Sequence, residues 1–191
     1  VQYVVRPQKD EFHDFRGYAG RIAGGVFKIG DDVTVLPSGF QSKIKSIETF
    51  NGRIDEAYAP MSITLTLEDD IDVSRGDMIV RPKNQPEVIQ DVEIMLCWMS
   101  ETPLINRGKY TLKHTSKEAR CMIKDIQYKV DINTLHRLED DKEIKCNDIA
   151  KVTLRVTQPL FADQYKDNRS TGSVIIIDEA TNNTVGAGMI V

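Results

Sequence analysis

Glycines are the residues of this chain whose spacing could bind a nucleotide. A phosphate-binding loop needs glycines whose backbone amides face the phosphates, followed by Lys and Ser or Thr at fixed spacing. None of the twelve glycines begins such a run. The nearest approach, Gly186-Ala187-Gly188, has no third glycine and no helix to follow, so we interpret it as a turn or a strand bend. The sequence predicts no nucleotide hydrolysis and no bound cofactor in these 191 residues.

Side chains that could hold a metal ion are scattered along the chain. His13, His114 and His136 have neither a partner four residues away nor a cysteine neighbour, so a zinc site would need ligands from distant segments. The acidic runs 68–72 and 139–141 could attract a divalent cation, but neither has the glycine and ligand spacing of a calcium loop. We interpret both runs as solvated loop ends and predict no metal site.

No serine lies in a motif that activates a hydroxyl as a nucleophile. Ser116, Ser170 and Ser173 lack a surrounding pattern such as GxSxG. A triad assembled from three separate loops stays open, although nothing in the sequence favours it. We therefore predict no catalytic residue in this chain.

The net charge and the cysteines indicate which kinds of partner the chain can bind and in which compartment we expect it. The formal net charge is −4, and both halves of the chain are net acidic. No positive field therefore draws the chain toward nucleic acid or an anionic membrane. The three cysteines are widely spaced and form no CxxC pair, which is typical of buried thiols in a reducing cytoplasm. We expect a cytoplasmic chain with no nucleic-acid and no membrane partner.

The elements that must position these residues are strands. Apolar and polar side chains alternate with a period of two over 63–67, 126–132 and 152–156, which is typical of half-buried strands. Turn signals separate such runs; Asn51-Gly52, for example, predicts the two positive-φ positions of a tight hairpin. The best helical candidate, 134–145, would form only one or two turns. The predicted fold class is all-β.

A stiff, polar segment divides the chain into two domains. Residues 81–87 hold two prolines, three charges and no large apolar side chain, which is typical of a solvated connector. We place the domains at 1–82 and 87–191, with a linker at 83–86. Each is long enough for a six-stranded antiparallel β-barrel, and closing a sheet in this way removes its exposed edges.

Two corners that combine glycine with arginine are candidate partner-contact or interdomain sites. They are Arg16, Gly17, Gly20 and Gly24 in the first domain, and Arg169, Ser170, Thr171 and Gly172 in the second. Glycines permit close backbone approach by a partner, and an exposed arginine can pair with a carboxylate or a phosphate. The simpler interpretation, in which both corners are only structural turns, stays open.

The chain resembles a known family along essentially its whole length. The glycine corner and second strand, 14–25 and 29–39, are similar to the opening of the β-barrel second domain of translation-factor-like GTPases. Further segments narrow the resemblance to the GTP-binding subunit of bacterial sulfate adenylyltransferase: 2–7, 45–47, 65–69, 71–77, 98–104, 110–114, 128–134, 147–150, 163–173, 175–178 and 181–189. Asp70, where that branch usually shows Glu, is a small departure.

The resemblance implies two consecutive six-stranded antiparallel β-barrels like domains 2 and 3 of elongation factor Tu. It also implies a parent protein that is the large subunit of a heterodimer. The catalytic small subunit makes adenosine 5′-phosphosulfate and pyrophosphate from ATP and sulfate, and GTP hydrolysis by the large subunit drives the reaction. GTP and magnesium would bind an N-terminal GTPase domain that is absent from these residues. That domain and the small subunit are the expected partners.

Two other interpretations of the barrels differ from this one. The tRNA-binding barrels of an elongation-factor-like GTPase would need clustered Lys and Arg along a groove, and the net acidic halves argue against them. A free-standing adaptor would be supported by a starting Met, whereas the chain begins with Val1, which we interpret as part of a longer polypeptide.

Overall fold

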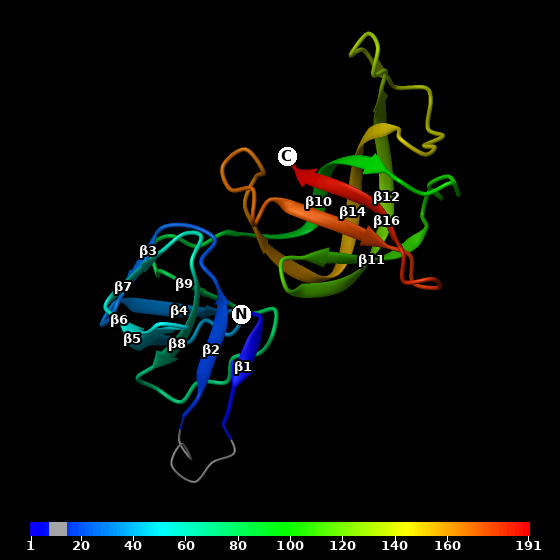
Figure 1. The fold of residues 1–191 in the computed structure, drawn as a ribbon. Coiled ribbons are helices and arrows are strands. Elements are labelled where there is room, and N and C mark those ends of the chain that lie inside the picture. Colours follow the sequence, from blue (N-terminus) through cyan, green and yellow to red (C-terminus); the bar gives the residue numbers. More distant parts are fainter. Residues whose placement is uncertain (8–14) are drawn as a thin grey trace. The chain divides into compact units, whose positions relative to one another are not determined.

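The protein is built of strands throughout the part that its computed structural model describes, residues 1–7 and 15–191 (Figure 1). These residues form sixteen strands and no helix, so the all-β prediction is confirmed. The helical turns expected over 134–145 do not occur: this segment holds only turns and the two-residue strand β13 (Arg137–Leu138). The physical reason is that the charged residues after Leu138 give a helix no apolar face to bury.

The chain divides into two compact units, Val1–Gln85 and Pro86–Val191. At the end of the first unit, Arg81 and Asn84 form an isolated antiparallel bridge, and the Asn84 amide donates to the Arg81 carbonyl over 3.1 Å. Residues 81–84 therefore make an exposed turn rather than an extended spacer. The linker at 83–86, with domains at 1–82 and 87–191, stays a prediction.

The first unit is an antiparallel sheet with a separate two-stranded ribbon. The sheet has the order β1-β2-β8-β5-β4-β9, with β6 added to β5, and the ribbon pairs β3 with β7. The strands are β1 (Tyr3–Val5), β2 (Gly17–Arg21), β3 (Val26–Lys28), β4 (Asp32–Leu36), β5 (Gln41–Thr49), β6 (Gly52–Ile54), β7 (Glu56–Tyr58), β8 (Ser62–Leu67) and β9 (Met78–Val80).

Alternation along β5 shows how the sequence builds the core of the first unit. Ser42 and Ile44 point inward between exposed neighbours, and a register shift between Ile44 and Ser46 then turns both Ser46 and Ile47 inward. The buried Ser46 hydroxyl is hydrogen-bonded to that of Thr66 over 2.8 Å, which removes the cost of an unpaired polar group. Each fully buried isoleucine contributes about 1.5–3 kcal/mol to stability.

Loop contacts, rather than a strand ladder, link the start of the chain to the turn before β9 in the first unit. In the described residues β1 and β9 lie at opposite ends of the pairing order. The Gly76 amide donates to the Val1 carbonyl over 3.0 Å, and an Arg75 guanidinium nitrogen donates to the Gln2 carbonyl over 2.8 Å. Gly76 has a φ of +95°, so it forms the corner that brings this loop to the start of the chain. Backbone pairing leaves this sheet open in the described residues, so a closed first barrel stays a prediction.

The β5–β6 hairpin has a different turn from the one predicted. Thr49 pairs with Gly52, so the two turn residues are Phe50 and Asn51. Of these residues only Gly52 has a positive φ, +108°, and the Thr49 hydroxyl donates to its carbonyl over 2.8 Å. The expectation of two positive-φ positions at Asn51-Gly52 is wrong because a glycine directly after the turn supplies the hairpin's bend.

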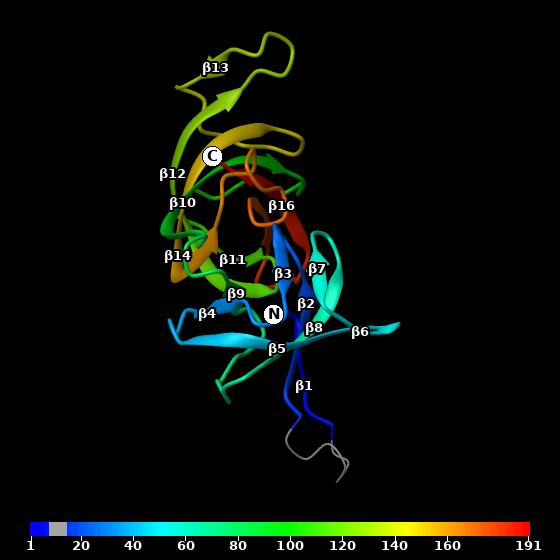
Figure 2. The same ribbon diagram turned by 90° about the vertical axis from the view of Figure 1, so that its left-hand side faces the viewer.

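The second unit is a closed six-stranded antiparallel barrel (Figure 2). The order is β11-β15-β16-β10-β14-β12, and β12 pairs again with β11, while β13 adds to the outer end of β12. The predicted six-stranded barrel is confirmed here. The strands other than β13 are β10 (Glu87–Trp98), β11 (Lys109–His114), β12 (Lys117–Val130), β14 (Ile149–Ala162), β15 (Ser173–Ile177) and β16 (Thr184–Ile190).

Glycines in β16 make room for the large side chains of β10 inside this barrel. Ile94, Leu96 and Trp98 are almost completely buried. A Cβ on Gly188 would lie 2.6 Å from Ile94 Cδ1, and one on Gly186 would lie 2.9 Å from Leu96 Cδ1. The Gly186-Ala187-Gly188 run, expected to be a turn or a strand bend, is therefore part of a strand that packs closely against its neighbour.

Candidate functional site

The first candidate corner holds its own unit together through Arg16. Arg16 Nη1 lies 2.6 Å from Asp70 Oδ1 and 3.5 Å from Asp72 Oδ1, and it donates to the Ile71 carbonyl over 3.2 Å. The Tyr18 hydroxyl donates to the same carbonyl over 2.6 Å, and burial raises the pKa of Tyr18. The side chain of Arg16 is 24% exposed. Arg16 thus anchors part of the acidic run 68–72 to the start of β2.

The glycines of the first corner differ in accessibility. Gly17 is buried, and a Cβ there would lie 2.6 Å from Thr64 Cγ2, so its small size serves packing against β8. Gly20 is half-buried beside Val1, with ordinary spacing of 3.7 Å for a Cβ. Gly24 lies in an exposed bend before β3. Of these three glycines, Gly24 is the one open to a partner.

The second candidate corner is a compact loop, residues 163–172, that joins β14 to β15 and is orange in Figure 1. The Asn168 side-chain oxygen accepts from the amides of Ser170, at 3.0 Å, and Thr171, at 3.4 Å. The Gly172 amide donates to the Asn168 carbonyl over 2.8 Å. A Cβ on Gly172 would lie only 2.4 Å from Tyr165 Cα. The loop satisfies these amides internally and depends on glycine at position 172.

His114 supports this loop from inside the barrel. It is 1% exposed, and its Nε2 lies 2.6 Å from the Thr171 carbonyl oxygen, which can only accept a hydrogen bond. Thr171 in turn donates its hydroxyl to Asp163 over 2.6 Å. Burial lowers the pKa of His114, while the bond to Thr171 and the charge of Asp163 offset part of that effect. His114 is therefore a neutral structural residue; His136 lies exposed in a loop, and His13 is outside the described residues.

The exposed part of the 163–172 loop presents a supported cation. The Arg169 guanidinium lies 6.0 Å from the centroid of the Tyr165 ring, and Arg169 and Ser170 are both exposed. Such an arginine can bind a carboxylate or a phosphate. Neither a base nor a second nucleophilic group is bonded to Ser170 in the described structure.

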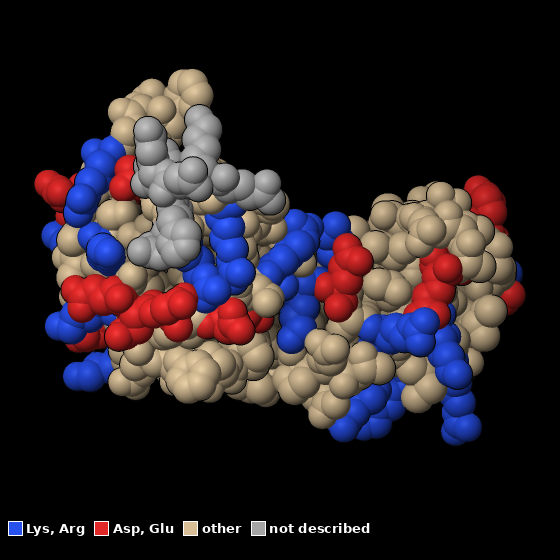
Figure 3. Space-filling model, turned by 90° about the horizontal axis from the view of Figure 1, so that it is seen from below, with Lys and Arg blue, Asp and Glu red and all other residues tan. Residues whose placement is uncertain are grey.

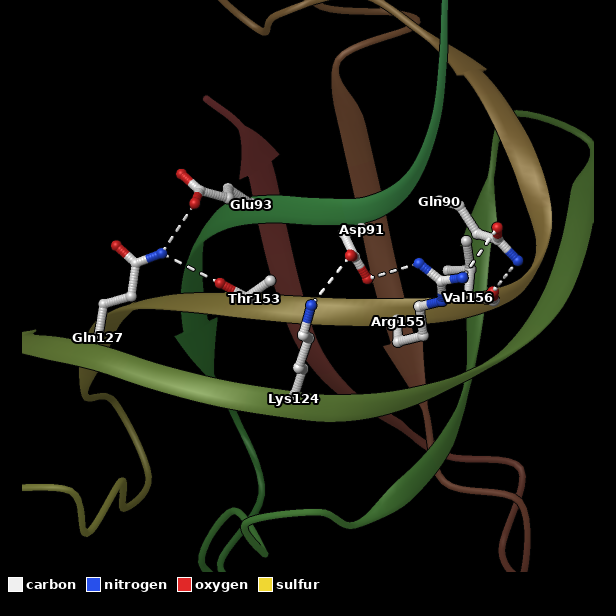
Figure 4. A network of polar contacts seen from close by, with 8 residues as sticks. All are labelled: Gln90, Asp91, Glu93, Lys124, Gln127, Thr153, Arg155 and Val156. Carbon is white, nitrogen blue, oxygen red and sulfur yellow. Dashed lines mark hydrogen bonds and ion pairs between the residues drawn. The ribbon is translucent and has the colours of Figure 1, made fainter.

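A polar network that the sequence did not indicate covers the outer face of β10, β14 and β12 (Figure 4). Asp91 accepts from Lys124 at 3.0 Å and pairs with Arg155 at 3.1 Å. Glu93 lies 2.8 Å from Lys151 and accepts from Gln127 at 3.0 Å. The hydrogen bond from Lys124 lowers the pKa of Asp91, and that from Lys151 lowers the pKa of Glu93.

This network joins three strands where β10 has a register shift, between Ile89 and Asp91. Its carboxylates are each neutralised by cations, so they are not poised as an acid and base pair. The alternation of polar residues indicates that these positions face outward. The pairs themselves depend on the register between strands more than thirty residues apart, which the sequence does not reveal.

In the described residues, the side chains that could bind a metal ion do not form a site. On the face drawn in Figure 3, acidic side chains lie beside basic ones over both units. Within residues 1–7 and 15–191, no group of three or more His, Cys, Asp or Glu could hold a metal ion. The described part of the chain also contains no helix that could cross a membrane.

Comparisons with known proteins agree with this fold. Residues 91–191 match the sequence model of the GTP-eEF1A C-terminal domain-like family, and the chain belongs to that family. Its whole length is 46% identical to the bifunctional enzyme CysN/CysC of Mycobacterium tuberculosis, 46% to sulfate adenylyltransferase subunit 1 of Bacteroides thetaiotaomicron and 48% to that of Sulfurovum sp.. The resemblance to the GTP-binding subunit of sulfate adenylyltransferase is therefore confirmed.

The chain spans only part of these relatives: 31% of the Mycobacterium protein and 40% of each of the other two. A crystal structure of Sup35 complexed with GDP superposes on the whole chain with a TM-score of 0.85 at 16% identity, and the chain covers 46% of it. At that identity the likeness shows a shared fold alone.

We predict that Gly172→Ala lowers the free energy of unfolding of the second unit by about 1–3 kcal/mol, because the added Cβ must displace the Tyr165 backbone. Gly20→Ala, where a Cβ has ordinary spacing, is the matched control and should have little effect on the first unit. Urea unfolding monitored by circular dichroism measures both. Equal effects of the two substitutions would contradict the close approach at Gly172.

We predict that the second unit loses stability as the pH falls below about 6.5, the ordinary pKa of histidine. Because burial lowers the pKa of His114, the unfolded chain takes up a proton there that the folded chain does not. The free energy of unfolding should then fall by up to about 1.4 kcal/mol per pH unit until the folded pKa is reached. His114→Gln, which keeps a donor for Thr171, should remove this slope, and an unchanged slope would contradict the assignment.

Proposed function

We propose that this chain provides the two β-barrel domains of the GTP-binding subunit of a sulfate adenylyltransferase. The observation that carries the proposal is the likeness to sulfate adenylyltransferase subunit 1 along the whole chain. The complete enzyme would convert ATP and sulfate into adenosine 5′-phosphosulfate and pyrophosphate, and GTP hydrolysis would drive this unfavourable reaction. The barrels would couple the two reactions without carrying out either.

The physical properties of the barrels suit such a coupling role. GTP can shift a conformational balance only if it interacts differently with two arrangements of domains. A closed ladder such as that of the second unit moves as a rigid body, so a small shift on one side is passed on as a displacement of its loops. The described residues offer contacts for this purpose but no constellation for nucleotide chemistry.

The proposal assigns GTP and magnesium to an N-terminal GTPase domain outside these residues, and ATP and sulfate to the catalytic small subunit. It places the protein in the cytoplasm. Cys97, Cys121 and Cys146 are free thiols, and burial raises the pKa of Cys121 to about 12. Three unpaired cysteines, one of them chemically inert, are consistent with a reducing compartment.

Within the proposal the two corners contact either the GTPase domain or the small subunit. Arg169 and Ser170 are accessible for that purpose, while Thr171 and Gly172 hold their loop in shape. At the first corner Gly24 is accessible. Gly17 and Gly20 support the strand that carries this corner, and Arg16 would have to share its guanidinium between a partner and Asp70.

We expect Arg169→Ala, in the complex of the whole GTP-binding subunit with the small subunit, to weaken GTP stimulation of adenylylsulfate synthesis about fivefold or more. The barrel's stability should stay within about 0.5 kcal/mol because the side chain is exposed. Arg120→Ala removes an arginine that is 78% exposed and paired with Glu179 on the same barrel, and it is the matched control. Wild-type stimulation in the Arg169 variant would remove Arg169 from the mechanism, and absence of stimulation in the wild-type complex would overturn the proposed function.

A further inference from the structure

The second unit carries a protruding turn that exposes two large apolar side chains. We call residues 131–140, which follow β12 and include β13, the knob. It extends beyond the barrel in both ribbon views (Figures 1 and 2). Within it Ile132 is 63% exposed and Leu135 is 77% exposed. Exposed apolar side chains grouped on a protrusion mark a surface for binding another molecule.

Asp131 makes the knob a preformed turn. Its amide donates to the His136 carbonyl over 2.9 Å, and its carbonyl accepts from the Leu135 amide at 2.7 Å. Its carboxylate accepts from the Asn133 amide at 2.8 Å, and that bond is the main cause of a lowered Asp131 pKa. The apolar side chains are therefore held in position before any partner arrives, which reduces the entropy lost on binding.

Three cations tether the knob and the segment after it to the barrel. Lys129 Nζ lies 2.7 Å from Asp141 and 3.1 Å from Asp148. Lys142 Nζ donates to the backbone carbonyls of residues 126 and 127. The Arg137 guanidinium lies 4.7 Å from the centroid of the Tyr128 ring. These three cations therefore hold the knob and the following segment against the barrel.

Leu135 is held in an unfavourable backbone conformation. Its φ is +59°, in the left-handed region that a bulky side chain rarely adopts. Its side chain meanwhile lies in water, so the strain is not offset by burial within this unit. Strained residues concentrate at sites that bind or act on another molecule, because a native contact there outweighs the local cost.

The charge of the knob's surface restricts the occupant. Glu139 and Asp140 are exposed, and neither forms an ion pair within the described structure. The negative charges of these carboxylates repel nucleic acid and an anionic membrane surface. A second copy of this chain would bring the same carboxylates face to face. The complementary surface is an apolar pocket on a different protein, bordered by Lys or Arg.

We propose that the knob is the docking site for a partner protein, with Ile132 and Leu135 inserted into an apolar pocket and Glu139 and Asp140 facing its basic rim. Exposed anchors of this kind dominate the energy of an interface once they are desolvated. The inference rests on the proposed function, which supplies the partner: the catalytic small subunit of sulfate adenylyltransferase encoded in the same genome.

The test measures the dissociation constant of the small subunit with the whole GTP-binding subunit by calorimetry. The double variant Ile132→Asp, Leu135→Asp should raise the dissociation constant at least tenfold. Phe50→Asp, at the fully exposed tip of the β5–β6 hairpin, and Ile105→Asp, at a position 60% exposed on the second unit, are matched controls. Each should change the constant less than threefold. Glu139→Lys with Asp140→Lys should weaken binding and reduce its dependence on salt.

Leu135→Gly separates docking from folding. Glycine accepts a positive φ without strain, so this variant should unfold at a higher temperature than the wild type while binding the small subunit more weakly. A purely structural role for Leu135 predicts that stability changes and binding does not. Tight wild-type binding that all knob variants retain overturns the knob as docking site and leaves the proposed function intact. No binding by the wild-type subunit overturns both.

Discussion

The pairing of β11 with both β12 and β15 is the constraint on which the second unit depends. Because it closes the ladder, every strand of that barrel has two neighbours, and no edge is left to pair with another chain. Closure also limits the interior volume, which buried side chains from all six strands share. Because the interior volume is limited, β16 needs glycine where it faces β10: a side chain at Gly188 would overlap Ile94.

A barrel closed in this way can present contacts only through its outer face and its loops. The outer face of β10, β14 and β12 is occupied by ion pairs among its own residues, such as those between Asp91 and its two basic neighbours. The loops are different. The 163–172 loop and the knob both satisfy their turn amides internally and expose side chains, Arg169 in one and Leu135 in the other. The side chains available to bind a partner therefore lie on the loops that connect the barrel strands.

Much of the fold could be predicted because it depends on local patterns. Alternation over 152–156 corresponds to buried and exposed faces of β14, and the missing helical stripe correctly indicated an all-β chain. The predictions were wrong where one local sequence pattern is compatible with two different structures. The Asn51-Gly52 pair fits either a two-residue turn or a turn followed by glycine, and the Thr49 side chain favours the second. At 134–145 a few apolar residues served a strand and an exposed turn instead of a helix.

The candidate site was only partly predictable, since glycine and arginine mark corners without showing their surroundings. The sequence identified Gly172 as special, but not that Tyr165 lies against it. It could not show that Arg16 is bound by Asp70, because that pair joins positions fifty-four residues apart. The positive φ of Leu135 was also hidden, because nothing in the residue type indicates a left-handed conformation.

The central claim is that the barrels couple two reactions that occur elsewhere in the enzyme. The most direct measurement compares the whole GTP-binding subunit with a variant that lacks residues 1–191, each mixed with the catalytic small subunit. GTP hydrolysis and adenylylsulfate formation are followed together. We expect the shortened protein still to hydrolyse GTP on its own, while adenylylsulfate formation no longer responds to GTP. An undiminished response to GTP without the barrels would contradict it.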